Sequence, residues 1–521
     1  MSRMPSIMSH DFSRVPRAEI PRSSFDRSSG MKTTFDSGVL TPIFVDEALP
    51  GDTFNLRLSA FARLATPLHP FMDNLYLNTF FFAVPMRLVW DNWPKFNGEQ
   101  TNPGDSTDFL IPNITQRPDG FDEGSTYDYV GIPTGVENLP PISALPFRAI
   151  NLIWNEWFRD QNLQDSLPVP KDDGPDPYNQ YYFLNRRGKR HDYFTSSLPW
   201  PQKGPGVDLP LGTSAPVRAD VVAGNNASLI GLSNENGNIR DIKTELTSAY
   251  MGTITTGLSP LYADLSAATA ATINQLRQAF QIQKLYERDA RGGTRYTEIV
   301  RAHFNVVSPD ARLQRPEYLG GGQSLVNLHT VPQSSGTGDY TASPQGNLAA
   351  YGTTSVQGHG FTKSFTEHTI LIGLVSVRAD LTYQQGVNKM WTRRTKYDFY
   401  WPALAMIGEQ AVLNSEIYCD GTPADLDVWG YQERWAEYRY RPSLITGQMR
   451  SSFAQSLDTW HLSQDFGTRP ALDAAFITDQ PPISRVIAVP TEPEFIGDFY
   501  FNLRCARPMP VYGVPGLIDH F

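Results

Sequence analysis

Prolines and glycines recur along the whole chain, and they limit the length of almost every helix that it can form. The 521 residues include 41 prolines and 40 glycines. Proline removes a backbone donor and glycine loosens the backbone, so their even spread divides the chain into short segments joined by turns and long structured loops. A chain of this length has room for three or four domains of about 150 residues, although all-β units often run longer as one domain. We therefore expect short elements and long loops.

Alternation of apolar and polar residues marks strands at widely separated positions. The predicted strands are Phe54–Ala60, Tyr76–Val84, Ile299–Phe304, Thr369–Tyr383, Tyr397–Trp401, Ile483–Val489 and Asp498–Cys505. Tight hairpins cannot join strands that are scattered over about four hundred residues, so the connections must be very long, which is typical of interfaces and functional loops. The pattern predicts an all-β fold, an eight-stranded jelly-roll β-sandwich with long loop insertions and a few short helices.

Helical spacing of apolar residues occurs mainly in two places. The first predicted helix covers Phe147–Phe158 and follows Pro146, which suits a first turn. The second begins near Ile273 and ends at the pair Gly292 and Gly293. We interpret both apolar stripes as packing faces.

The sharpest change of composition covers Gly206–Thr272. Phe, Trp and His are absent from this segment, and Gly, Ser, Thr, Ala and Asn dominate it. It carries six carboxylates against three cations and has no apolar period strong enough to form a core by itself. The segment is predicted to be an external, solvated insertion.

The segment Asp11–Phe35 is polar, basic and rich in Pro and Ser, without a sustained helical or alternating period. Such a segment cannot bury enough surface to order itself, so we expect an N-terminal arm over residues 1–40 that orders on another surface. Met1–Lys32 carries six Arg and Lys residues, Arg14 and Arg17 among them, against three carboxylates. This surplus suits the inner surface of a container and an ordinary soluble tail equally well.

The formal net charge of −10 limits which partners the chain can neutralise. Binding a polyanion requires cations that face the phosphates. A chain that encloses nucleic acid with this charge must concentrate its basic residues on one face or use a separate basic partner. The chain is therefore not a bulk neutraliser of DNA.

Two cysteines, Cys419 and Cys505, exclude a disulfide scaffold and have no metal-ligand spacing. Cys505 follows apolar residues at every second position, which predicts a small buried side chain on a strand in a reducing cytoplasm. We expect no export signal, and the longest apolar runs are too short for a membrane span.

The search for catalytic motifs finds no P-loop, dinucleotide-binding, hydrolase-elbow or zinc-protease pattern. We therefore expect no enzyme, no catalytic residues and no cofactor, and the sequence assigns no metal ligands. His303 and His368 are interpreted as structural. Asp425 and Asp427 lie in a Gly/Pro turn that favours local hydrogen bonds, with a glycosidase carboxylate pair as the alternative.

Two basic clusters interleave cations with aromatic rings. One covers Arg186–Arg190, and the other contains Lys389, Arg393, Arg394 and Lys396. Cations that follow phosphates beside rings that stack on bases bind single strands without sequence choice. Arg and Tyr are equally enriched at protein interfaces, and we favour subunit contacts for most of these residues. The second cluster, with Arg14 and Arg17, is the predicted nucleic-acid contact.

Several long blocks together resemble one family of proteins. They are FVDEALPGDTF at Phe44–Phe54, RLATPLHPFMDN at Arg63–Asn74, RLVWDNWPKFNGEQ at Arg87–Gln100, RRGKRHDYFTSSLPWPQKGP at Arg186–Pro205, QIQKLYERDARGGTRY at Gln281–Tyr296, SPDARLQRPEYLGGG at Ser308–Gly322, GYQERWAEYRYRPS at Gly430–Ser443 and PGLIDH at Pro515–His520. They resemble the major capsid protein of the Microviridae, small single-stranded DNA phages, and most closely the gokushoviruses. The blocks run nearly from end to end, so chance is a poor explanation.

The resemblance implies a jelly roll of the viral capsid type that self-assembles through pentamers into a small T=1 icosahedral shell around circular single-stranded DNA. It implies an internal scaffolding protein, a small basic DNA-binding protein and a DNA pilot protein as partners, with assembly in the host cytoplasm. The insertion would form a threefold protrusion that contacts a receptor on the bacterial surface. Candidate contacts there are Asn225, Asn226, Asn234, Asn236 and Asn238.

The predicted division of the chain is an arm over 1–40, a first part of the jelly roll over 41–205, the insertion over 206–272, and a second part with the C-terminal tail over 273–521.

The rival interpretation is a jelly-roll carbohydrate-binding protein or glycoside hydrolase that uses aromatic residues of Trp429–Tyr440 as a sugar platform. A general single-strand DNA-binding protein conflicts with the net charge.

Overall fold

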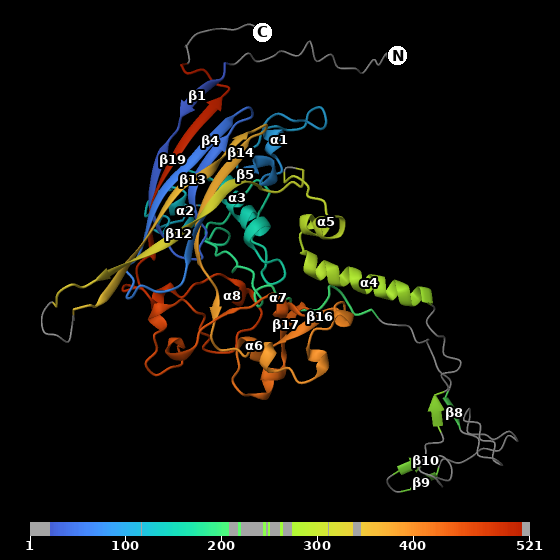
Figure 1. The fold of residues 1–521 in the computed structure, drawn as a ribbon. Coiled ribbons are helices and arrows are strands. Elements are labelled where there is room, and N and C mark those ends of the chain that lie inside the picture. Colours follow the sequence, from blue (N-terminus) through green and yellow to red (C-terminus); the bar gives the residue numbers. More distant parts are fainter. Residues whose placement is uncertain are drawn as a thin grey trace. The chain divides into compact units, whose positions relative to one another are not determined.

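The structure is a computed structural model that describes residues 21–115, 117–207, 273–310, 312–336 and 345–512, together with four short strands between 217 and 263. The chain divides into two compact units (Figure 1). The first contains residues up to Pro201 and from Thr294 onward, and the second contains Gln202–Gly293.

Eight strands of the first unit form a jelly roll of two four-stranded antiparallel sheets. One sheet has the order β2 (Ser29–Phe35), β19 (Phe495–Arg507), β4 (Thr53–Leu64) and β13 (Leu348–Ser364). The other has the order β3 (Thr41–Ala48), β14 (Thr369–Ala379), β5 (Leu75–Pro85) and β12 (Glu317–Pro332). In chain order, successive strands of the eight change sheet except at β5 and β12, which pair within one sheet, as a jelly roll requires. This arrangement confirms the predicted fold class. The short β1 (Ser23–Asp26) extends the first sheet by pairing with β19.

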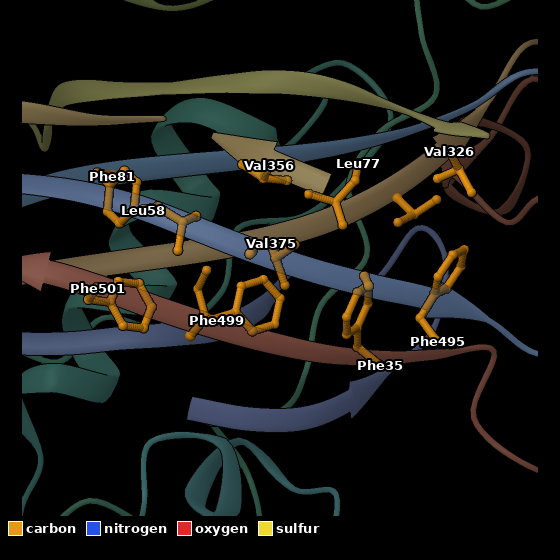
Figure 2. Close-up of a cluster of buried hydrophobic side chains, with 14 of the residues drawn as sticks. Phe35, Leu58, Leu77, Phe81, Val326, Val356, Val375, Phe495, Phe499 and Phe501 are labelled. Carbon is orange, nitrogen blue, oxygen red and sulfur yellow. The ribbon is translucent and has the colours of Figure 1, made fainter. Parts of the chain in front are cut away.

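The main core lies between these two sheets. Phe499 and Phe501 of β19, Leu58 of β4, and Phe81 and Val375 of the opposite sheet meet there (Figure 2). Each of these side chains is at most 2% exposed. Burial of so many large apolar side chains, at about 1.5–3 kcal/mol each, holds the sandwich together.

Strands β12 and β13 join the two sheets at one corner. Their distal halves pair with each other from Asn327 opposite Thr353, and their proximal halves separate, β12 toward β5 and β13 toward β4. Glycine permits close backbone approach within the proximal halves. A Cβ atom on Gly320 would lie 2.4 Å from the carbonyl oxygen of Gly360, and one on Gly360 would lie 2.0 Å from that of Leu56.

A second apolar layer covers the outer face of the β3–β14–β5–β12 sheet. Helix α3 (Leu145–Ile153), continued by the π-helical turn η3 (Trp154–Phe158), packs against β14. Ile370, Ile372 and Leu374 of β14 are buried with this layer. The predicted helix over Phe147–Phe158 is thereby confirmed, and its stripe is a packing face.

Two long connections carry most of the remaining structure: residues 86–316 between β5 and β12, and residues 380–494 between β14 and β19. Their short α-helices are α1 (Trp93–Phe96), α2 (Thr126–Tyr129), α5 (Tyr296–Phe304), α6 (Asn414–Ile417), α7 (Ala436–Arg439) and α8 (Ala474–Ile477). Their short strands within the first unit are β6 (Asn113–Ile114), β7 (Ile142–Ser143), β15 (Thr382–Tyr383), β16 (Glu409–Leu413), β17 (Val428–Glu433) and β18 (Ser443–Leu444). The predicted long connections are confirmed.

Four of the predicted strands are confirmed, at Phe54–Ala60, Tyr76–Val84, Thr369–Tyr383 and Asp498–Cys505. Cys505 is buried on its strand as expected.

Three predicted strands are wrong. Ile299–Phe304 belongs to helix α5, because Tyr296, Ile299 and Val300 also follow a helical period and Glu298 accepts hydrogen bonds at the helix start. Tyr397–Trp401 begins in a 3-10 turn that Asp398 closes by accepting hydrogen bonds from two backbone N–H groups.

Ile483–Val489 likewise begins in a 3-10 turn, Ile483–Arg485, which follows two prolines. The Arg485 guanidinium donates to the carbonyl oxygens of His461 and Ser463. Backbone pairing is limited to an isolated bridge between Ile487 and Pro67, so no strand forms here.

The expectation that Asp11–Phe35 has no folded element is wrong for residues 23–35. Strands β1 and β2 pair with β19 of the same chain, and Phe35 stacks on Phe495 at 5.4 Å between ring centroids. Arg27 binds Asp46 of β3 through two hydrogen bonds of 2.7 and 2.9 Å. The backbone ladder and this ion pair supply the order that the side-chain pattern did not predict. Residues 1–20 lie outside the described residues.

The second unit contains helix α4 (Ile273–Gly292) and the strands β8 (Val217–Ala219), β9 (Lys243–Glu245), β10 (Ser248–Tyr250) and β11 (Leu261–Ala263). The predicted helix and its glycine end are confirmed. Its apolar stripe is not buried in this unit, since Ile273 is 70% and Phe280 63% exposed. The interpretation of that stripe as a packing face is therefore wrong within the unit.

Candidate assembly and nucleic-acid surface

The connection between β14 and β19 forms a loop layer with a small core of its own. It contains the antiparallel pair β16 and β17. Residues buried in this core come from both long connections: Tyr193, Phe194, Tyr383, Val412, Ile417, Trp429, Ala436 and Phe476. The surface residues of the loop layer are therefore attached to a segment that has its own buried core.

Two segments of this layer, 388–408 and 434–450, make one surface that we call the ring-and-cation surface. The Trp435 indole N–H donates to the Leu404 carbonyl oxygen at 3.0 Å, and its ring meets Tyr400 edge to face at 5.8 Å. Arg434 donates to the Tyr397 carbonyl oxygen at 3.3 Å. Each segment has four Arg or Lys residues and one carboxylate, so the surface is basic in an acidic protein.

Two of the predicted nucleic-acid contacts on this surface are engaged by buried carboxylates. The Lys389 ammonium donates to the Ala411 carbonyl oxygen at 2.8 Å and lies 3.4 Å from Glu416. Arg393 donates to Glu437 at 3.2 Å, and its guanidinium lies 4.2 Å from the centroid of the Tyr438 ring. Because carboxylates already neutralise Lys389 and Arg393, neither side chain is well placed to bind a phosphate.

Glu416 is held from a second side, by the Tyr193 hydroxyl that donates to it at 2.7 Å. Burial, with the charge of Glu416 beside it, raises the pKa of Tyr193 far above its usual value. The Tyr193 hydroxyl therefore stays protonated and keeps donating. The sequence carried no signal for the partnership of Lys389 with Glu416, which lies 27 residues away.

The other two predicted contacts, Arg394 and Lys396, are exposed. The Lys396 ammonium lies 5.0 Å from the centroid of the Tyr397 ring. Within the described residues, neither side chain forms an ion pair. Arg394 and Lys396 are thus available to an anionic partner.

The rings of this surface face solvent in the single chain. Trp391 is 74% exposed. The other large apolar or aromatic side chains of this surface with more than a third of their area exposed are Met390, Tyr397, Phe399, Tyr400, Trp401, Met406, Ile407, Tyr438, Tyr440 and Leu444. Exposed large apolar side chains that gather on one surface mark an interaction site. Aromatic residues, Met and Arg are also the types enriched at protein interfaces.

A cavity of about 420 Å³ opens beside these rings. Its walls include the rings of Tyr193, Trp391 and Tyr440, with Lys389 and Glu416 among the charged groups. Its volume and mixed lining suit a side chain of a partner or a small molecule.

The other basic cluster, Arg186–Arg190, serves mainly the fold of its own chain. Arg186 donates to the Ser37 carbonyl oxygen at 2.8 Å, and Arg187 donates to Asn78 at 3.2 Å. The Lys189 ammonium lies 4.5 Å from the centroid of the Phe476 ring. Burial lowers the pKa of Lys189 to about 8 and that of Arg187 to about 10. Lys189 is buried and Arg186 and Arg187 are partly buried, whereas Arg190 is exposed and lies 3.6 Å from Asp380.

The remaining chemical candidates are structural. Asp425 accepts from the Gly421 backbone N–H at 2.8 Å and pairs with Arg469 at 2.7 Å, as the turn interpretation expected. His303 lies on helix α5, not on a strand, and the His368 ring meets Trp93 edge to face at 5.3 Å. Within the described ranges, no group of three or more His, Cys, Asp or Glu side chains is placed to hold a metal ion.

A sugar platform over Trp429–Tyr440 is not supported. Trp429 and Trp435 are buried in the loop layer, and the Trp429 indole N–H donates to the Pro470 carbonyl oxygen at 2.8 Å. Among the aromatic residues of this segment, only the tyrosines reach the surface. A row of parallel exposed rings is therefore absent from this described segment.

Several predicted contacts lie outside the described residues: Arg14, Arg17, Asn225, Asn226, Asn234, Asn236 and Asn238. Among the helices that the structure describes, none is both long and apolar enough to cross a membrane.

Comparison with known proteins identifies the family. The family model described as capsid protein (F protein) matches residues 13–517. Capsid protein VP1 of Bdellovibrio phage phiMH2K is 52% identical over 98% of both chains. Capsid protein VP1 of Chlamydia phage 1 is 44% identical over 99% of both, and that of Spiroplasma virus 4 is 38% identical over 98% of this chain and 97% of its own length.

The matches extend over nearly the whole chain and agree with the jelly roll, so the predicted resemblance to gokushovirus major capsid proteins is confirmed. The role that follows is structural, in the shell of a virion, and the carbohydrate alternative is not supported. The chain belongs to the capsid protein (F protein) family of small phages.

Proposed function

We propose that this protein is the repeating unit of a T=1 icosahedral shell that encloses circular single-stranded DNA, assembles in the host cytoplasm and has no catalytic activity. The observation that carries the proposal is the exposed ring-and-cation surface of a chain that belongs to a capsid family. Closed symmetry requires complementary patches on each copy, and such patches are exposed only before assembly. Trp391 and its neighbours are therefore proposed as subunit contacts.

The net charge of −10 supports a separate basic partner for the genome. Shell subunits that are acidic overall repel phosphates, so a small basic DNA-binding protein would neutralise most of the charge. An internal scaffolding protein and a DNA pilot protein complete the proposed set of partners.

Arg394 and Lys396, with Arg14 and Arg17, remain proposed DNA contacts. Lys389 and Arg393 are weaker candidates, because Glu416 and Glu437 already engage them. Host contact is proposed for the insertion 206–272 through Asn225, Asn226, Asn234, Asn236 and Asn238, since its acidic, polar composition suits an external position.

Sedimentation velocity of the purified chain, alone and with a candidate scaffolding protein, tests the proposal, with electron microscopy of any fast species. Pentamers or closed shells are expected. A Trp391→Ser variant should shift the distribution toward the monomer, whereas Tyr512→Ser, a change at an exposed ring outside the ring-and-cation surface, should not. A wild-type chain that stays monomeric under both conditions would overturn the proposal.

A further inference from the structure

The outer face of the β2–β19–β4–β13 sheet has no covering layer in the described structure, and we call it the bare face. Buried and exposed residues alternate strictly from Phe54 to Leu64 on β4 and from Phe495 to Cys505 on β19. The exposed side chains include large rings and aliphatic groups: Phe61 is 52%, Ile496 63% and Tyr500 51% exposed. The strands of this face run side by side in Figure 1.

Three guanidinium groups on the bare face are available to an anion. Arg57, Arg63 and Arg504 are exposed, and among the described residues none of them has an ion pair or a side-chain hydrogen bond. Arg57 and Arg63 lie six residues apart on one strand, or about 20 Å at 3.4 Å per residue. Arg504 is a diagonal neighbour of Arg57, which faces Asn502 across the ladder.

Two carboxylates share this face. Asp498 lies 3.6 Å from the Lys32 ammonium, and Asp26 faces Arg504 in the register of β1 and β19. The bare face therefore carries four cations, Lys32 and the three arginines, and two carboxylates, in a chain whose overall charge is −10. The bare face is locally basic.

The two rings of the bare face stand among small or polar neighbours. Tyr500 faces Ser59 on one side and Gly30 on the other, and Phe61 faces Ser355 and Asp498. Neither ring stacks on another ring within the described residues. Tyr500 and Phe61 are diagonal neighbours, about 7–8 Å apart. Flat, accessible rings between cations are the arrangement that holds single-stranded nucleic acid through stacking and phosphate contacts.

We infer that the bare face binds single-stranded nucleic acid, with Arg57, Arg63 and Arg504 on phosphates and Tyr500 and Phe61 on bases. The inference rests on the proposed function, since only a subunit that encloses a genome would present this face to it. A second copy of the chain is a poorer occupant, because a twofold contact through this face would bring arginines against arginines. A basic protein is excluded by the sign of the charge.

The test measures binding of the soluble full-length chain to a fluorescein-labelled 30-nucleotide oligodeoxythymidine by fluorescence anisotropy, between 50 and 200 mM salt. The variant carries R57Q, R63Q and R504Q. A matched control carries K171Q, R301Q and R312Q, which remove the same charge from exposed positions elsewhere. Circular dichroism and thermal unfolding check that both variants fold.

The bare-face variant should bind the oligonucleotide more weakly and lower the slope of log affinity against log salt by about 2, or about 0.7 for each lost phosphate contact. The control should keep the wild-type slope. Ultraviolet cross-linking of the wild-type complex should give modified peptides that contain Tyr500 or Phe61. An unchanged slope in the bare-face variant, an equal loss in the control, or cross-links confined to other surfaces would overturn the inference.

Sedimentation velocity of the same variants without nucleic acid separates this inference from the proposed function. If the bare-face variant assembles like the wild type and loses only oligonucleotide binding, both proposals stand. If it loses assembly in the absence of nucleic acid, the bare face is a subunit contact and the inference is wrong, while the capsid function stands.

Discussion

The two sheets of the jelly roll have strands of similar length, but their outer faces meet different surroundings. Strand β14 is buried on both faces, since Leu371 and Val375 enter the sandwich core while Ile370, Ile372 and Leu374 pack under the α3 layer. On β4 and β19, every second residue is exposed. One sheet therefore has two apolar faces and the other has only one.

This difference shows that one sheet of the sandwich can stabilise the fold with its outer face while the other sheet leaves its outer face free to contact partners. The covered face ties the long connection between β5 and β12 to the fold, whereas the bare face contributes little to folding and is free to carry charge and rings. Because the outward residues of β4 and β19 have no packing role, their identity reflects what they meet outside the chain.

The largest expected effect concerns the anchor of the covering layer. Arg148 of α3 is fully buried and binds Asp176 through hydrogen bonds of 2.7 and 2.6 Å. Asp176→Asn would remove the buried counter-charge of the guanidinium and leave it only the exposed Asp172, so the free energy of unfolding should fall by about 3–5 kcal/mol in urea denaturation. Asp172→Asn, at a side chain that is 77% exposed, should cost less than about 0.5 kcal/mol. Equal losses would show that burial of the pair is not what matters.

A pair of identical truncations compares the two faces directly. Ile372→Ala removes methylene and methyl groups from under the covering layer and should cost about 2–5 kcal/mol. Ile496→Ala on the bare face should change the free energy of unfolding by less than about 0.5 kcal/mol. Urea unfolding of both variants measures the difference, and a large loss at Ile496 would reveal a layer over the bare face.

A buried cation beside the covered region makes stability depend on pH. Folding lowers the pKa of Lys189 from 10.5 to about 8, because burial disfavours its charge. The unfolded chain then binds more protons between these values, so wild-type stability should rise with pH through this window. The rise is at most about 3 kcal/mol, and Lys189→Met should remove it. Urea unfolding from pH 7 to 10.5 checks this, and parallel wild-type and variant curves would contradict it.

The smallest expected effect lies on the bare face. Lys32 and Asp498 are 3.6 Å apart with side chains 80% and 57% exposed. A double-mutant cycle with Lys32→Met and Asp498→Asn should give a coupling energy below about 0.5 kcal/mol, because water screens exposed pairs. A coupling above 1 kcal/mol would indicate that something excludes water from this face.

The sequence pattern predicted the strands with the clearest alternation of apolar and polar residues and missed the strands that lack it. Strands β12 and β13 are rich in Gly, Ser, Thr and Gln, and much of their length is exposed, so no apolar alternation marked them. They are strands because their distal halves pair with each other and their proximal halves pair with β5 and β4, which are distant in sequence. Ile299–Phe304 and Tyr397–Trp401 show the opposite error, since Glu298 caps a helix over the first segment and Asp398 closes a 3-10 turn at the start of the second.

The candidate contact residues were also predicted only in part. The sequence located the basic, aromatic segment Lys389–Lys396, but it could not distinguish Lys389 and Arg393, which carboxylates engage, from Arg394 and Lys396, which stay exposed. It gave no sign of Arg57, Arg63 and Arg504 as a group. They lie on two strands more than four hundred residues apart, and only the register of the ladder places them on one face.

The sequence by itself determined the family, the jelly-roll class, the long connections and the acidic charge, because these follow from local patterns and from long shared blocks. The tertiary structure alone decided which face of which sheet is covered and which cations remain free. Those properties depend on contacts between distant segments, and a side chain's burial and partners are fixed only when the whole fold has closed around it.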